Sequence, residues 1–139
     1  FIGINSIEKW SEKNNPEGSN GMVSDKDLKK IRKILSQKEL KDKYKIVLMH
    51  HHLNKIRNSE EYPAHSLWLK TVDYKMKLHN KNKLTELFRK QKVNLVLHGH
   101  THVNDAYNIK GVTYIHSSAS CAPLTDDQAR MLTVETIRI

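Results

Sequence analysis

Residues 93–102 read VNLVLHGHTH, and residues 44–52 show the same order of an apolar run followed by histidines, YKIVLMHHH. Short apolar runs that contain Ile and Val are typical of strands buried in a sheet. We therefore predict buried strands at Tyr44–Met49 and Val93–Leu97. A helical crossover between them makes the two strands parallel, so both should end at the same edge of the sheet, where α/β proteins place their ligands.

The residues before this region predict a strand, a loop and a helix. Phe1–Ser6 has the composition of a short strand, and Ser11–Gly21 is rich in Asn, Ser and Gly, as loops are. Ser24 is predicted to be a helix N-cap with Asp27 three residues later, a relative of the capping box. Apolar residues at spacings of three and four then predict one inward-facing stripe through about Gln37. These residues are Leu28, Ile31 and Leu35.

The later residues predict a second helix and further strands. The stretch Ser66–Gln91 is predicted to be mostly helical, with a break near Asn80–Asn82. Asp105–Ile109 and Val112–His116 flank a two-residue turn and predict a β-hairpin, and Arg130–Ile139 alternates as a strand does. The fold class that follows is α/β with a mixed sheet whose buried strands lie under helices. The helical residues expected to face inward are Leu84, Leu87 and Phe88.

The composition limits the class of protein. The chain has 139 residues, 37% hydrophobic and 28% charged, which suits one globular domain and excludes a disordered or fibrous protein. The single cysteine, Cys121, excludes an intramolecular disulfide framework and a cysteine-rich zinc site. It also fits a reducing compartment, so we expect a cytoplasmic protein. No apolar run approaches the ~18–20 residues that a membrane-spanning helix needs.

The net charge of +9 would suit nucleic-acid binding, but its distribution does not favour that function. Lys supplies 19 of the 24 basic residues and Arg only five, and Arg is the residue that makes bidentate base contacts. Aromatic residues make up 6% of the chain, so stacking platforms for single strands would be sparse. A basic surface would still attract a phosphorylated substrate.

The nine histidines carry the chemical prediction. Neutral imidazole is the commonest metal ligand, and a divalent ion needs several ligands from different chain segments. His50, His51 and His52 follow one predicted strand, and His100 and His102 follow the other, which favours a metal site at the shared edge. Because the side chains of His100 and His102 would diverge in an extended turn, they suit two neighbouring metal ions better than one.

The other histidines have a structural interpretation. His98 is on the same strand face as Val96, which suits a hydrogen-bonded or core residue. Gly99 would let the backbone turn sharply after the strand. The remaining three are interpreted as surface or core residues: His65, His79 and His116.

Taken together, the two motifs resemble those of a known family. KIVLMHHHL at Lys45–Leu53, followed by LVLHGHTH at Leu95–His102, is similar to the last two metal motifs of the calcineurin-like metallophosphoesterases. That group resembles cyclic-nucleotide phosphodiesterases and purple-acid-phosphatase-type enzymes. The resemblance implies the C-terminal part of a four-layer α/β/β/α sandwich with mixed sheets. It also implies a hydrolase that cleaves a phosphoester, with a phosphodiester or a cyclic nucleotide as the favoured substrate.

The same resemblance implies a site with two divalent metal ions, Mn, Fe or Zn. By position, His50 and His100 would bind one ion and His102 the other. His51 is the alternative to His50, because the triplet can be aligned one residue later, and Leu53 stands where the family often has Pro. The implied mechanism is hydrolysis by a metal-activated water without a covalent intermediate.

The loop after the triplet is the natural substrate-facing segment. Asn54, Lys55 and Arg57 are candidates for contact with phosphate. The expected partner is a phosphorylated small molecule or a nucleotide. The resemblance places the catalytic general acid upstream, so no catalytic residue is expected within residues 1–139.

The family's earlier motifs, D-x-H, G-D-x-x-D and G-N-H followed by Asp or Glu, do not occur in residues 1–139, and the sequence starts abruptly at Phe1. We therefore expect residues 1–139 to be the C-terminal portion of a single metallophosphoesterase domain. The intact protein would be the enzyme, and this portion alone would bind metal weakly without turnover. The alternatives are a non-catalytic metal-binding or scaffold member of the same fold, and a basic nucleic-acid-binding domain.

Overall fold

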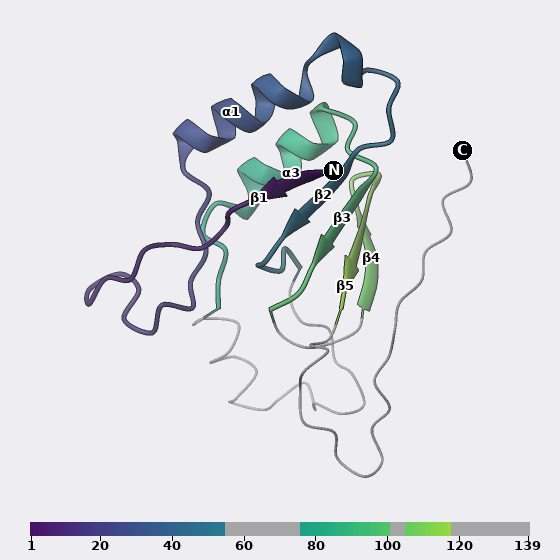
Figure 1. The fold of residues 1–139 in the computed structure, drawn as a ribbon. Helices are drawn as coiled ribbons and strands as arrows, with labels where there is room; N and C mark the ends of the chain where they lie inside the picture. The colour runs from purple at the N-terminus through teal and green to yellow at the C-terminus, as the bar shows by residue number, and fades with distance from the viewer. Residues whose placement is uncertain (55–75, 101–104, 118–139) are drawn as a thin grey trace, which may run out of the picture.

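The computed structural model describes residues 1–54, 76–100 and 105–117, which form a five-stranded sheet with two α-helices against one face (Figure 1). The order of the strands in the sheet is β1-β2-β3-β5-β4. The first four in that order are parallel, and β4 pairs antiparallel with β5. The sheet is therefore mixed, as predicted. The strands are β1 (Ile2–Ile4), β2 (Ile46–Met49), β3 (Leu95–His98), β4 (Asp105–Ile109) and β5 (Val112–His116).

Helix α1 (Asp25–Leu35) begins where the capping pattern predicts. The main-chain N of Asp27 donates to Ser24 Oγ at 3.1 Å, and that hydroxyl donates to Asp27 Oδ2 at 2.6 Å. This arrangement satisfies one of the free N–H groups at the start of the helix. Ile31 and Leu35 are buried, which confirms the predicted stripe, and a short 3₁₀ turn, η1 (Lys38–Leu40), follows the helix.

Residues 76–79, predicted to be helical, lie outside helix α3 (Lys81–Lys90). Residues 76–80 are not helical, because their polar groups bind the loop before α1 instead. The main-chain N of Val23 donates to Asn80 Oδ1 at 3.2 Å, and Asn80 Nδ2 donates to the Val23 carbonyl. The predicted break near Asn80–Asn82 is thus the start of the helix, and the first part of the predicted helix lies outside the described residues. The inward-facing residues Leu84, Leu87 and Phe88 are buried, as predicted.

The β4–β5 hairpin has the predicted boundaries. Lys110 and Gly111 in its turn have φ angles of 54° and 83°, the left-handed pair that a type I′ hairpin turn requires. The strand predicted at Arg130–Ile139 lies outside the described residues.

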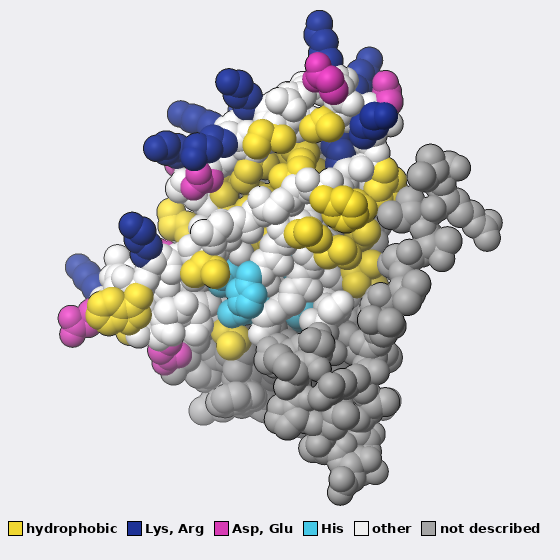
Figure 2. All heavy atoms as spheres, viewed as in Figure 1, with side chains coloured by type: hydrophobic (Ala, Val, Ile, Leu, Met, Phe, Trp, Pro, Cys, Tyr) yellow, Lys and Arg dark blue, Asp and Glu magenta, His cyan; other side chains and the backbone are white. Residues whose placement is uncertain are grey.

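The main core lies between the sheet and the two helices. Val47, Val96 and Tyr114 from three neighbouring strands are fully buried there. The opposite face carries a smaller cluster of Ile46, Leu95 and Ile115. Strand β2 is not buried throughout as predicted, because Leu48 on this second face is 41% exposed. Figure 2 shows hydrophobic side chains at the surface in this region, and Lys and Arg side chains over α1.

Lys45, directly before β2, connects the carboxyl ends of both helices. Its Nζ donates to the carbonyl of Gln91, the C-cap of α3, at 2.7 Å, and to the carbonyl of Leu35, the last residue of α1, at 3.4 Å. A cation at this position complements the negative ends of two helix dipoles. In the part of the chain that the structure describes, no helix is long and apolar enough to cross a membrane.

Candidate functional site

The two histidine motifs meet at one edge of the sheet. β2 and β3 are parallel, with Val47 opposite Val96, so both chains leave the sheet at the same edge, as predicted. The main-chain N of Gly99 donates to the carbonyl of His50 at 3.2 Å, which connects the two loops directly after their strands. This edge is where open α/β sheets bind ligands.

His50 and His100 are in direct contact at this edge. Nδ1 of His100 lies 2.6 Å from Nε2 of His50, and the ring centroids are 4.5 Å apart. His50 is exposed and His100 is half-buried. The two nitrogens therefore converge at this edge, next to the exposed His50 side chain.

The backbone at His100 is unusual. Its φ angle is 88°, a left-handed conformation that a residue with a β-carbon adopts at a cost of order 1–3 kcal/mol. The sequence placed the sharp turn on Gly99, but the left-handed residue is the next one. The strained position thus belongs to a histidine that points at His50, and strained backbone of this kind is concentrated at functional sites.

His51 lies beneath this pair and is only 1% exposed. Its Nδ1 is 2.8 Å from Ser6 Oγ, and its Nε2 is 3.2 Å from the carbonyl oxygen of Ser19. Its ring centroid is 5.0 Å from that of His50 and 4.5 Å from that of His100. Burial lowers the pKa of His51 below its ordinary value, so the ring is neutral at pH 7.

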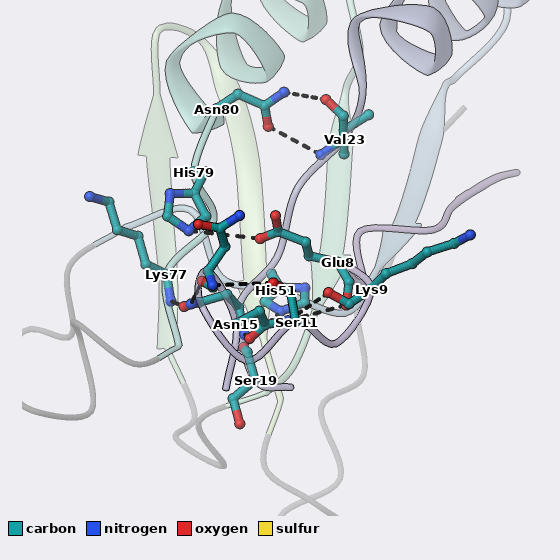
Figure 3. A network of polar contacts seen from close by, with 12 residues as sticks. Glu8, Lys9, Ser11, Asn15, Ser19, Val23, His51, Lys77, His79 and Asn80 are labelled. Carbon is teal, nitrogen blue, oxygen red and sulfur yellow. Dashed lines mark hydrogen bonds and ion pairs between the residues drawn. The ribbon is translucent and has the colours of Figure 1, made fainter. Parts of the chain in front are cut away.

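The loop between β1 and α1 encloses His51, and this role was missed from sequence (Figure 3). The buried Asn15 organises the loop, because its Nδ2 donates to the carbonyl of Glu8 at 3.2 Å and its Oδ1 accepts from the main-chain N of Asn20 at 3.0 Å. Nε2 of His79 lies 3.8 Å from a carboxylate oxygen of Glu8. The richness of this stretch in Asn and Ser predicted a loop, but composition gives no information about what a loop contacts.

A second row of rings lies behind the site. His98 Nε2 is 2.6 Å from the hydroxyl of Tyr107, and the His98 ring stacks on His116 with centroids 4.7 Å apart. Burial lowers the pKa of His98 to about 3 and that of His52 to about 4. These imidazoles are therefore neutral at pH 7. His98 is buried and hydrogen-bonded, as predicted, and His116 is also buried.

The other candidate residues are only partly covered. Asn54 is half-buried at the end of a described segment. Lys55, Arg57, His65 and His102 lie outside the described residues. Within residues 1–54, 76–100 and 105–117, no group of three or more His, Cys, Asp or Glu side chains is placed to hold a metal ion.

Comparison with known proteins adds one positive finding. The model of the family described as calcineurin-like phosphoesterase matches residues 5–104, a range that includes both histidine motifs. None of the curated proteins matches the chain.

Proposed function

Because the chain belongs to the calcineurin-like phosphoesterase family, we propose that it takes part in metal-dependent hydrolysis of a phosphoester, with a phosphodiester or a cyclic nucleotide as the favoured substrate. In this proposal residues 1–139 are the C-terminal portion of a single metallophosphoesterase domain. The family match over residues 5–104 supports the phosphoesterase assignment, and the sequence resemblance to the last two metal motifs supports the C-terminal placement.

The observation that carries the proposal is the contact between His50 Nε2 and His100 Nδ1, 2.6 Å apart at the carboxyl edge of the sheet. Two imidazole nitrogens that converge from different segments fit a divalent transition-metal ion. We propose that they bind one of two ions, chosen from Mn, Fe and Zn, and that His102 binds the other. His50 is preferred over His51 because both ring nitrogens of His51 lie within hydrogen-bond distance of oxygen atoms.

In this proposal the metal ions and the residues of the chain have different roles in hydrolysis. Divalent ions held by these residues would supply Lewis-acid polarisation of a phosphoryl oxygen and activation of water for attack. The residues of the chain bind and orient: His50 and His100 as metal ligands, and Asn54, Lys55 and Arg57 as contacts for the phosphate. The net charge of +9 would attract an anionic substrate to the protein.

Substitution of the paired histidines tests the proposal in the natural full-length protein. His50→Ala and His100→Ala are each expected to abolish Mn²⁺-dependent hydrolysis of bis(p-nitrophenyl) phosphate and to weaken Mn²⁺ binding measured by calorimetry. His79→Ala is the matched control, because the His79 ring lies beside Glu8 and belongs to neither histidine motif. Wild-type hydrolysis in either site variant would contradict the assignment.

A further inference from the structure

We infer that His51 is a positioning residue of this centre, whose ring sets the orientation of His50 and His100. Ser6 and Ser19 hold the ring in place, and Gly21 leaves room for it. This inference rests on the proposed function of the site. It assigns an orienting role to the middle histidine of the triplet. It also explains why a glycine stands at position 21, which the composition of the loop does not indicate.

The hydrogen bonds of His51 define its protonation pattern. The carbonyl oxygen of Ser19 can only accept, so Nε2 of His51, 3.2 Å away, carries the hydrogen. Nδ1 is then an acceptor, and the Ser6 hydroxyl donates to it at 2.8 Å. The same hydroxyl accepts from the main-chain N of His51 at 3.3 Å. The ring is therefore the neutral Nε2–H tautomer, with both nitrogens occupied by protein oxygens.

Gly21 leaves the space that the ring occupies. A β-carbon on Gly21 would lie 2.5 Å from Cγ, 2.6 Å from Nδ1 and 2.7 Å from Cδ2 of His51. The backbone at this residue is held in place, because its N donates to the carbonyl of Lys77 at 2.9 Å and its carbonyl accepts from the N of His79 at 2.9 Å. A larger residue at position 21 would therefore displace the His51 ring.

The His51 ring touches both proposed ligands. It meets His50 edge-to-face, with an interplanar angle of 88° and centroids 5.0 Å apart. It meets His100 at 43° with centroids 4.5 Å apart. Substitution of a residue that orients a metal ligand commonly changes the affinity of the site for its metal. If the His51 ring were displaced, the rings of His50 and His100 would therefore turn. The backbone of His100 is the strained one.

Gly21→Ala tests this, with Gly3→Ala as the matched control because a β-carbon on Gly3 meets no atom within 4 Å. In the metal-free protein at pH 8, long-range ¹H–¹⁵N spectra of the histidine rings should show His51 as the Nε2–H tautomer. Gly21→Ala should shift the ring resonances of His50 and His100, and Gly3→Ala should not. With Zn²⁺, the His51 nitrogens should remain uncoordinated, and Gly21→Ala should weaken zinc binding by about tenfold or more.

Three results would overturn the inference: an Nδ1–H tautomer of His51, coordination of zinc by a His51 nitrogen, or a Gly21→Ala variant with unchanged His50 and His100 resonances. If Gly21→Ala does not fold, the pair Ser6→Ala and Ser6→Thr replaces it. The alanine variant should then shift the two rings, and the threonine variant, which keeps the hydroxyl, should restore them. If the wild type binds no zinc and hydrolyses no phosphoester, the proposed function fails, whereas the metal-free spectra still decide the role of His51.

Discussion

The hydroxyl of Tyr107 lies 2.6 Å from Nε2 of His98 and so joins β4 to β3 across the intervening strand β5. The Tyr107 ring also stacks on Tyr114 of β5, with centroids 5.2 Å apart and planes 1° from parallel. Burial raises the pKa of Tyr107 to about 12 and lowers that of His98 to about 3, so both groups are neutral at pH 7. This contact links the β4–β5 hairpin to β3, the strand that leads to His100.

Tyr107→Phe is expected to destabilise the protein by about 1–3 kcal/mol, because it leaves a buried imidazole nitrogen without its partner. Urea unfolding followed by circular dichroism measures this change. Tyr44→Phe, at a tyrosine that is 48% exposed, is the control and should have little effect. Equal stability of the Tyr107→Phe variant and the wild type would show that the bond contributes nothing.

Lys45→Met should destabilise the fold by about 1–3 kcal/mol, because the carbonyls of Leu35 and Gln91 lose a charged donor, while Met replaces the chain of the lysine as far as Cε. The exposed Lys43→Met provides the comparison. Thermal or urea unfolding of both variants gives the difference. The prediction is wrong if the two variants unfold together.

The ion pairs of Glu86 should make stability depend on pH in the acid range. Hydrogen bonds from Arg89 and Lys110 lower the pKa of Glu86 to about 2 from its ordinary value of 4.5. Because the pKa in the folded state is the lower one, the contribution is complete above about pH 4.5 and is lost as the pH falls towards 2. Glu86→Gln should therefore be less stable than wild type at pH 7, with a difference that shrinks as pH approaches 2. Glu39→Gln, an exposed residue on η1, is the control, and a pH-independent difference would contradict the argument.

Lys55→Ala and Arg57→Ala are expected to raise the KM for a phosphodiester by roughly tenfold each, because a charge-assisted hydrogen bond to phosphate is lost. Metal affinity should stay unchanged, since neither residue is a proposed ligand. Steady-state kinetics of the natural full-length protein and Mn²⁺ calorimetry separate the two effects. A loss of metal binding with an unchanged KM would reverse the assignment.

Local signals predicted much of the fold. Ser24 with Asp27, and the Lys110–Gly111 turn, are short-range patterns whose energetics depend on neighbours in sequence, so the start of α1 and the hairpin agree with prediction. The prediction of helix at residues 76–79 was wrong, because Asn80 binds Val23, a partner that lies far away in sequence.

In the candidate site, too, some features could be predicted from local sequence patterns and others depend on distant contacts. The meeting of His50 and His100 follows from strand order and the usual handedness of crossovers, which sequence patterns can convey. The enclosure of His51 depends on Ser19 and Gly21 arriving from a loop, and nothing in their local sequence indicates that contact. The left-handed conformation of His100 is likewise set by tertiary packing, because intrinsic preference alone would place it on Gly99.

The parallel pairing of β2 with β3 also bears on the order in which the molecule folds. Among the strand pairings that the structure describes, only that of β4 with β5 joins residues close in sequence, and hairpins form in about 1–10 μs. The pairings of β1 with β2 and of β2 with β3 close long loops, and such non-local contacts slow folding. Because His50 and His100 directly follow β2 and β3, we expect them to come together only when these two strands pair, so metal-binding competence should depend on one of the slower contacts to form.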